Sequence, residues 1–154
     1  MLETFANPDL LAQAAAAAVQ AAQAAAIAER GAAVLVATGG RSPAPVYDLL
    51  AQAPLGWGSV TVTLSDDRFV PPTSLESNER LVRERLLVAK DASAQFTPLS
   101  FDVANVKEAA LRAEPGVKAL APYDVMLLGM GEDGHVASLI PGSPVMDEGM
   151  NPAG

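Results

Sequence analysis

Short apolar runs that alternate with helical patterns are the feature that most constrains the fold of this chain. Residues 33–37 and 125–128 are apolar runs of strand length, residues 60–64 alternate valine and threonine as a strand does, and residues 95–99 are expected to form a further short strand. The helical patterns lie at residues 8–30, 43–53, 78–89 and 102–114. Because strands that alternate with helices form a mainly parallel sheet with helices on both faces, the sequence predicts a Rossmann-like α/β fold. We find no internal repeat and no linker, so residues 1–154 are expected to form a single domain.

The ends of several elements carry local signals. Pro8 suits the first turn of the helix at residues 8–30, and Gly31 suits the position just after its last turn. Ser77 is expected to cap the helix at residues 78–89. The helix at residues 102–114 is expected to end before Pro115. The strand at residues 125–128 is expected to be buried on both faces.

Charge and composition exclude several classes of function. The net charge of −8 disfavours binding to nucleic acid or to an anionic membrane, although a few local donors can still bind a small anion. The first helix is rich in alanine, which is too weakly apolar to predict a membrane span. Cysteine is absent, so there is no disulfide framework and no thiolate metal site. Together with an N-terminus that lacks the basic start of a signal peptide, these features predict a cytoplasmic protein.

Three of the expected strands lead into loops rich in glycine or polar residues. The carboxyl ends of parallel strands share one edge of the sheet, and open α/β sheets bind ligands at that edge. The residues expected to gather there are Gly39, Gly40, Arg41, Ser42, Asp67, Arg68, Asp133 and His135.

The first and last of these loops suggest specific chemistry. A strand, a glycine pair and a helix start at Pro43 point backbone N–H groups at an anion, although the glycine pair alone leaves a plain βα turn as an equal alternative. His135 is the only histidine, and it is the unperturbed side chain most suited to acid–base chemistry near neutral pH. Its alternative role is that of a structural histidine capping a turn. For Arg68 the alternative is a salt bridge to a neighbouring aspartate, and for Asp133 it is a helix cap or a plain turn.

Three motifs, in order along the chain, carry a resemblance to a known family. They are Thr38-Gly-Gly-Arg-Ser-Pro43, Asp66-Asp-Arg-Phe-Val-Pro71 with Ser77-Asn78, and Leu128-Gly-Met-Gly-Glu-Asp-Gly-His-Val-Ala-Ser-Leu139 with Pro141-Gly142. Together they resemble the 6-phosphogluconolactonase family, and the third motif is the most specific. The resemblance implies the fold group of sugar-phosphate isomerases and CoA transferases. It also implies hydrolysis of 6-phospho-D-glucono-1,5-lactone in the pentose phosphate pathway.

Two alternatives stand beside the lactonase. Glucosamine-6-phosphate deaminases share the Gly-Asp-Gly-His core, but there the histidine is followed by an Ala-Phe-Asn-Glu type of sequence. The Val136-Ala-Ser-Leu139 sequence of this chain is similar to the lactonase form. Members of the family continue beyond the third motif, so this chain is expected to lack a C-terminal part. An inactive sugar-phosphate-binding fragment is therefore the non-enzymatic alternative.

The resemblance and the residues together lead to a mechanistic hypothesis. His135 is expected to take a proton from the attacking water, kept neutral by a predicted helix N-terminus at that point. Asp133 would orient the imidazole or the water, and Arg68 would stabilise the oxyanion or bind the phosphate. The expected substrate-binding residues are Gly39, Gly40, Arg41, Ser42, Asp67 and Gly131. The scheme requires no cofactor and no metal, and it leaves the oligomeric state open.

Overall fold

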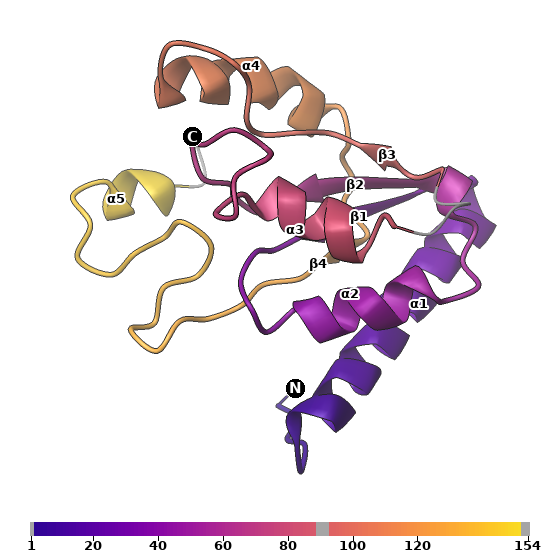
Figure 1. Ribbon diagram of the computed structural model, residues 1–154. Coiled ribbons are helices and arrows are strands. Elements are labelled where there is room, and N and C mark those ends of the chain that lie inside the picture. The colour runs from indigo at the N-terminus through magenta and orange to yellow at the C-terminus, as the bar shows by residue number, and fades with distance from the viewer. Residues whose placement is uncertain (1, 89–92, 152–154) are drawn as a thin grey trace.

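A four-stranded parallel sheet organises the fold (Figure 1). The computed structural model describes residues 2–88 and 93–151. Its strands are β1 (Ala33–Ala37), β2 (Val60–Leu64), β3 (Gln95–Phe96) and β4 (Val125–Met126). They lie in the order β3-β2-β1-β4, and each neighbouring pair is parallel. The predicted α/β fold with a parallel sheet is therefore confirmed.

The helices are α1 (Pro8–Arg30), α2 (Ala44–Ala51), α3 (Asn78–Arg85), α4 (Val106–Lys118) and the single turn α5 (Met146–Gly149). A short 3₁₀ turn, η1 (Trp57–Ser59), leads into β2. In the chain, α2 connects β1 to β2, α3 connects β2 to β3, and α4 connects β3 to β4. Helix α1 packs on α2 and β1, and α2 packs on α3. Figure 1 shows α4 above the sheet and the segment that ends in α5 projecting to the left.

Helix α1 has the bounds that its sequence predicts. Asn7 caps its first turn by accepting a hydrogen bond from the Leu10 N–H at 2.9 Å, and Gly31 ends it with a left-handed φ of 76°. The buried side chains of α1 lie on one face and are Ala12, Ala16, Val19, Gln23 and Ala26. In the described ranges α1 is also the one helix long and apolar enough, by length and composition, to cross a membrane. Its small apolar side chains serve here to bring the helix close to α2 and β1.

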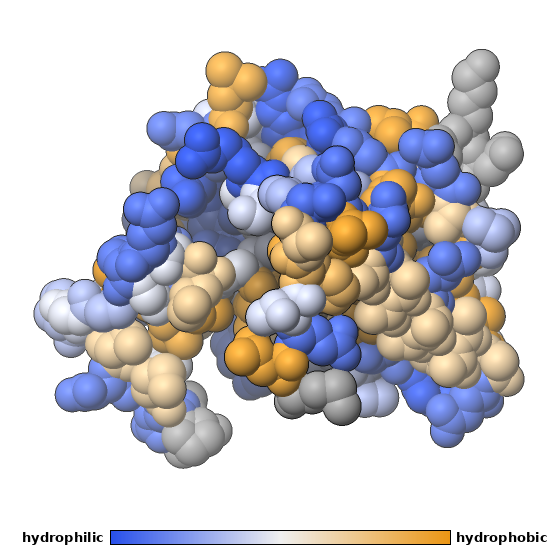
Figure 2. All heavy atoms as spheres, turned by 90° about the horizontal axis from the view of Figure 1, so that it is seen from below, coloured by the Kyte–Doolittle hydropathy of each residue, from blue (hydrophilic) through white to orange (hydrophobic). Residues whose placement is uncertain are grey.

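The hydrophobic core lies around β1, β2 and the helices that cover them. Leu35 and Val62 on the two central strands, and Tyr47 and Leu50 on α2, are fully buried. Residues 8–88, which we call the body, hold most of this core. We call the segment 127–151 the arm, and none of its side chains is among the buried core residues. Figure 2 shows the arm at the left, with a hollow between it and the rest of the molecule.

The prediction for the fourth helix was wrong at both ends. Helix α4 begins at Val106, because Asn105 caps it by accepting a hydrogen bond from the Glu108 N–H at 3.0 Å. It continues through Pro115 to Lys118. Proline removes one hydrogen bond to the preceding turn, but its own carbonyl still accepts one from the Ala119 N–H at 3.1 Å. One missing bond near the last turn does not end this helix.

Four further elements are shorter than expected. Helix α2 spans Ala44–Ala51 instead of residues 43–53. Helix α3 ends at Arg85, and part of the expected range 86–89 lies outside the described residues. Strand β3 spans two residues, and so does β4. The expectation that residues 125–128 are buried on both faces was wrong, since Met126 is 51% exposed and Leu128 is 52% exposed. Within the described ranges β4 pairs with β1 alone, so its other side has no strand to cover it.

Candidate active site

The register of the sheet brings three loops to one edge. Ala37 at the end of β1 lies opposite Leu64 at the end of β2, and Val36 lies opposite Met126 of β4. The chain leaves all three strands in the same direction because the pairs are parallel. The loops that begin at Thr38, at Ser65 and at Leu127 therefore start side by side.

The loop after β1 lies against the start of α3. A Cβ atom added to Gly39 would lie 1.9 Å from the Asn78 Oδ1 atom, so the close approach of the two segments requires glycine at position 39. Gly40 has a φ of 94°, which favours glycine as well. Arg41 and Ser42 are exposed, and in the described part of the chain no side-chain partner holds Arg41. The loop thus presents its backbone and a guanidinium to solvent, as an anion site requires.

The carboxylate of Asp67 is occupied by the N-terminus of α3. It accepts hydrogen bonds from the Asn78 N–H at 2.7 Å, from the Glu79 N–H at 3.2 Å and from the Ser77 hydroxyl at 3.4 Å. Ser77 in turn accepts from the Arg80 N–H, as expected of its capping position. Asp67 therefore stabilises this helix start, and its contact with a substrate stays a prediction.

Asp66 and Asn78 connect the three loops. The Asn78 Nδ2 group, which lies against Gly39, donates to the Asp66 carbonyl oxygen at 2.9 Å. The Asp66 Oδ2 atom accepts a hydrogen bond from the Ser138 hydroxyl at 2.9 Å. Asn78 thus joins the first loop to the second, and Ser138 joins the arm to the second.

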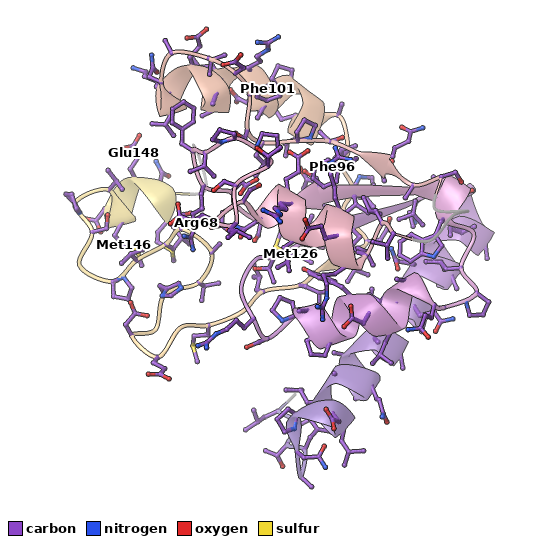
Figure 3. All side chains as sticks on the ribbon, in the orientation of Figure 1. Arg68, Phe96, Phe101, Met126, Met146 and Glu148 are labelled. Carbon is purple, nitrogen blue, oxygen red and sulfur yellow. The ribbon has the colours of Figure 1, made fainter. Side chains whose placement is uncertain are left out.

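The side chain of Arg68 is exposed and has no partner among the residues that the structure describes. The alternative of a salt bridge to Asp66 or Asp67 does not occur, since no ion pair or side-chain hydrogen bond of Arg68 forms within the described ranges. Arg68 lies at one side of a cavity of about 350 Å³ between its own loop and α4. Figure 3 shows Arg68 near the start of α3, on the side towards α5. The guanidinium is free to bind a ligand, but the cavity that it lines contains no residue of the first or third loop.

His135 and Asp133 form a close pair in the arm. The Nδ1 atom of His135 lies 2.6 Å from the Asp133 Oδ1 atom, which also accepts the His135 backbone N–H at 3.3 Å. These bonds with His135 hold the pKa of the Asp133 carboxyl below its usual value. A carboxylate at Nδ1 fixes the ring proton there and leaves the lone pair on Nε2. The pair therefore presents an oriented base.

Gly131 makes this pair possible. A Cβ atom at position 131 would lie 2.3 Å from the His135 Nδ1 atom and 2.6 Å from the Asp133 Oδ1 atom. The turn is closed by the Gly131 N–H, which donates to the His135 carbonyl at 2.9 Å. Gly131 is thus needed as backbone beside the imidazole, whereas its predicted contact with the substrate stays a prediction.

The expected helix N-terminus at His135 is absent, so that part of the sequence-based hypothesis was wrong. Val136 and Leu139 exchange backbone hydrogen bonds at 3.2 and 2.9 Å, which closes a tight turn instead. The next helix in the described ranges is the single turn α5, which starts at Met146. The orientation of His135 comes from Asp133, not from a helix dipole.

Sequence reasoning missed one residue that holds the first loop. The hydroxyl of Tyr47, on α2, contacts both backbone groups of Thr38. Tyr47 carries no local signal in the sequence because it occupies an apolar position of an ordinary helix. Asn78 and Ser138 lie within the quoted motifs, but their links to Asp66 become visible only in three dimensions. As for metals, the described residues contain no group of three or more His, Asp or Glu side chains that could hold an ion.

The fold and the site together describe an α/β protein whose parallel sheet leads at one edge into a glycine-rich loop and into the segment that holds the histidine–aspartate pair. The chain matches the model of the glucosamine-6-phosphate isomerases/6-phosphogluconolactonase family over residues 6–152, and it belongs to that family.

Similar proteins agree with this membership. The chain is 49% identical to a 6-phosphogluconolactonase of Caulobacter vibrioides over 97% of its own length and 65% of the relative's. It is 46% identical to a 6-phosphogluconolactonase of Rhizobium meliloti over 98% of its own length and 66% of the relative's. The chain thus spans about 65% of the length of these curated relatives.

Solved structures give the same fold. The structure of a 6-phosphogluconolactonase from Shewanella baltica superposes with a TM-score of 0.91 at 34% identity, covering 96% of this chain and 64% of the other. A monomeric glucosamine-6-phosphate deaminase superposes with a TM-score of 0.75 at 22% identity, which shows the shared fold.

Proposed function

We propose that this chain carries the catalytic base and the phosphate loop of a 6-phosphogluconolactonase. The reaction is hydrolysis of 6-phospho-D-glucono-1,5-lactone to 6-phosphogluconate. The observation that carries the proposal is the 2.6 Å pair of His135 and Asp133, on the same sheet edge as the loop of Gly39 and Gly40. The relatives named 6-phosphogluconolactonase support the choice of substrate.

The reaction begins with a proton transfer at His135. As water attacks the lactone carbonyl, Nε2 of His135 takes one of its protons, and the carbonyl oxygen becomes an oxyanion. Asp133 keeps the other ring nitrogen protonated and stabilises the imidazolium that forms. The exposed guanidinium of Arg68, on the second loop, has no side-chain partner among the described residues and stabilises the oxyanion or the phosphate.

Collapse of the tetrahedral intermediate completes the reaction. The bond between the carbonyl carbon and the ring oxygen breaks, and His135 returns its proton to that oxygen. The products are one hydroxyl and one carboxyl group, which ionises at neutral pH. Backbone N–H groups at Gly39 and Gly40, together with Arg41 and Ser42, hold the phosphate away from the reacting carbon.

A coupled assay with 6-phosphogluconate dehydrogenase tests the proposal, with the spontaneous hydrolysis of the lactone subtracted. It is run on this chain and on a chimera that adds the unmatched part of the Caulobacter vibrioides relative. We expect His135→Gln to reduce turnover to the spontaneous rate while circular dichroism stays unchanged, because the side chain is partly exposed and outside the core. Equal turnover in the mutant and the unmodified protein would refute the role of His135.

The same experiment separates the alternatives. Release of ammonia from glucosamine 6-phosphate would identify a deaminase instead. Binding of 6-phosphogluconate without turnover in either chain would identify a sugar-phosphate-binding protein. Turnover by the chimera alone would show that the matched part needs the remaining third of the relatives for catalysis.

A further inference from the structure

The phenol of Tyr47 lies where a buried hydroxyl needs partners. The side chain is fully buried between α2 and the sheet, and it is among the largest buried side chains of the molecule. An unpaired hydroxyl in such a place destabilises the folded state. Tyr47 avoids this cost in an unusual way, because both of its contacts go to the backbone of a single residue.

That residue is Thr38. The Tyr47 hydroxyl donates to the Thr38 carbonyl oxygen at 2.6 Å and accepts from the Thr38 N–H at 2.8 Å. Thr38 is buried and directly follows the last residue of β1. The regular ladder stops one residue earlier, where the Ser65 N–H donates to the Ala37 carbonyl at 2.7 Å. The phenol therefore satisfies the backbone at the point where the chain leaves the sheet.

The next residues, 39–42, form the loop that we propose binds phosphate. Gly39 follows Thr38 and lies against the Asn78 side chain, so the loop is supported on a second side. From Gly40 to Ser42 the chain is exposed and has no comparable support. The direction in which these N–H groups point is thus set at Thr38 and Gly39.

We infer that Tyr47 is a positioning residue for phosphate binding, acting through the backbone of Thr38 on the Gly39–Gly40 loop. The inference rests on the proposed function for the identity of the substrate, but it requires only that this loop binds a phosphate group. Tyr47 touches neither the substrate nor His135, so its removal weakens phosphate binding and leaves the proton transfer unchanged.

The chain offers a matched pair of variants. Tyr47→Phe removes the hydroxyl and keeps the ring. Tyr123→Phe removes the hydroxyl of the other tyrosine, which also donates to a backbone carbonyl, that of Val117 at 2.9 Å. Tyr123 precedes β4 and so lies at the opposite edge of the sheet from the loop. Inorganic phosphate serves as the first probe, followed through the amide chemical shifts of Gly39 and Gly40. 6-Phosphogluconolactone and the unphosphorylated glucono-1,5-lactone serve as the second.

We expect Tyr47→Phe to raise the Kd for inorganic phosphate roughly tenfold and to lower the amide order parameters of Gly39 and Gly40. With the phosphorylated lactone we expect KM to rise by a similar factor while kcat stays within about twofold. The rate with the unphosphorylated lactone should not change. Tyr123→Phe should match the unmodified protein in every measurement.

Several outcomes would overturn the inference. One is an unchanged Kd and unchanged order parameters in Tyr47→Phe, and another is the absence of any phosphate-induced shift at Gly39 and Gly40 in the unmodified protein. Equal losses with both lactones would show a structural role alone. If Tyr47→Phe does not fold, hydrogen exchange in the unmodified protein decides: phosphate must slow exchange of the Thr38 amide, and no change refutes the link. Phosphate binding at Gly39 and Gly40 without lactone turnover by either this chain or the chimera would sink the proposed function and leave this inference standing.

Discussion

The body and the arm hold their parts of the site by different means. In the body, the loop after β1 is fixed by buried groups, namely the Tyr47 phenol below it and Asn78 beside it. In the arm, His135 is fixed by an exposed aspartate two residues away, and its segment is joined to the body by a hydrogen bond of Ser138. The difference teaches that the loop proposed to bind phosphate depends on the core for its position, whereas the proposed base His135 depends on local turn geometry.

The largest test compares one leucine of the body with one isoleucine of the arm. Leu50 is fully buried on α2, so Leu50→Ala should lower the free energy of unfolding by about 3 kcal/mol. Ile140 is 51% exposed, so Ile140→Ala should change it by less than about 0.5 kcal/mol. Urea unfolding followed by circular dichroism measures both. Similar losses would show that the arm belongs to the same cooperative core, and the comparison would fail.

A second test uses alkaline pH to isolate the buried phenol. Burial raises the pKa of Tyr47 from its ordinary value of 10.0 to about 12, and the hydrogen bond from Thr38 opposes this in part. Below pH 10 the phenol is neutral in both states, and its contribution to stability is fully present. Between about pH 10 and 12 the unfolded state loses its proton first, so the free energy of unfolding falls, by about 3 kcal/mol in total.

Tyr47→Phe has no phenol proton to lose at this position. Between pH 10 and 12 its free energy of unfolding should therefore fall by about 3 kcal/mol less than that of the unmodified protein. Urea unfolding at a series of pH values measures the difference. Parallel curves for the two proteins would mean that the phenol titrates as it does in the unfolded chain.

A third test exchanges one aspartate in each region. Asp67→Ala removes the acceptor of the first N–H groups of α3, and we expect a loss of about 2 kcal/mol in the free energy of unfolding. Asp133→Ala removes an exposed carboxylate, so unfolding should be nearly unaffected while lactone turnover falls. A larger loss of unfolding free energy in Asp133→Ala than in Asp67→Ala would contradict the division between body and arm.

The smallest expected effect concerns the contact between the two regions. Ser138→Ala removes the hydrogen bond to Asp66, and we expect a change below about 0.5 kcal/mol in unfolding because the serine is exposed. Turnover should nevertheless fall several-fold, since His135 directly precedes the tight turn that contains Ser138. Ser143→Ala is the control, because the Ser143 hydroxyl accepts a hydrogen bond within the arm itself, from the Val145 N–H. Equal turnover in the two variants would exclude a role for the Asp66 contact.

Elements with strong local signals were predictable from sequence. The ends of α1 follow from Pro8 and Gly31, and β1 and β2 follow from apolar runs bounded by turn residues. The ends of helix α4 were not predictable, because the cap at Asn105 and the proline at position 115 give competing signals that only packing resolves. The exposure of β4 also lies outside local reasoning, since it depends on which strands flank it.

Parts of the candidate site were predictable from the sequence, and other parts were not. The three loops that start side by side at the sheet edge were identified from the sequence, because parallel strands end together. The closeness of His135 and Asp133 required the turn around Gly131, and the capping role of Asp67 required the position of α3. The contact of Tyr47 with Thr38 joins an apolar helix position to backbone groups, so no pattern of residues in the sequence predicts it.

The open side of β4 has a consequence for how this chain behaves in solution. No strand within residues 2–88 and 93–151 pairs with its outward backbone groups, and these groups together with the half-exposed Met126 offer what an incoming strand needs. The net charge of −8 keeps separate molecules apart at low ionic strength. Added salt screens that repulsion, so light scattering from a concentrated sample should rise with ionic strength, and purification is expected to work best in dilute, low-salt buffer.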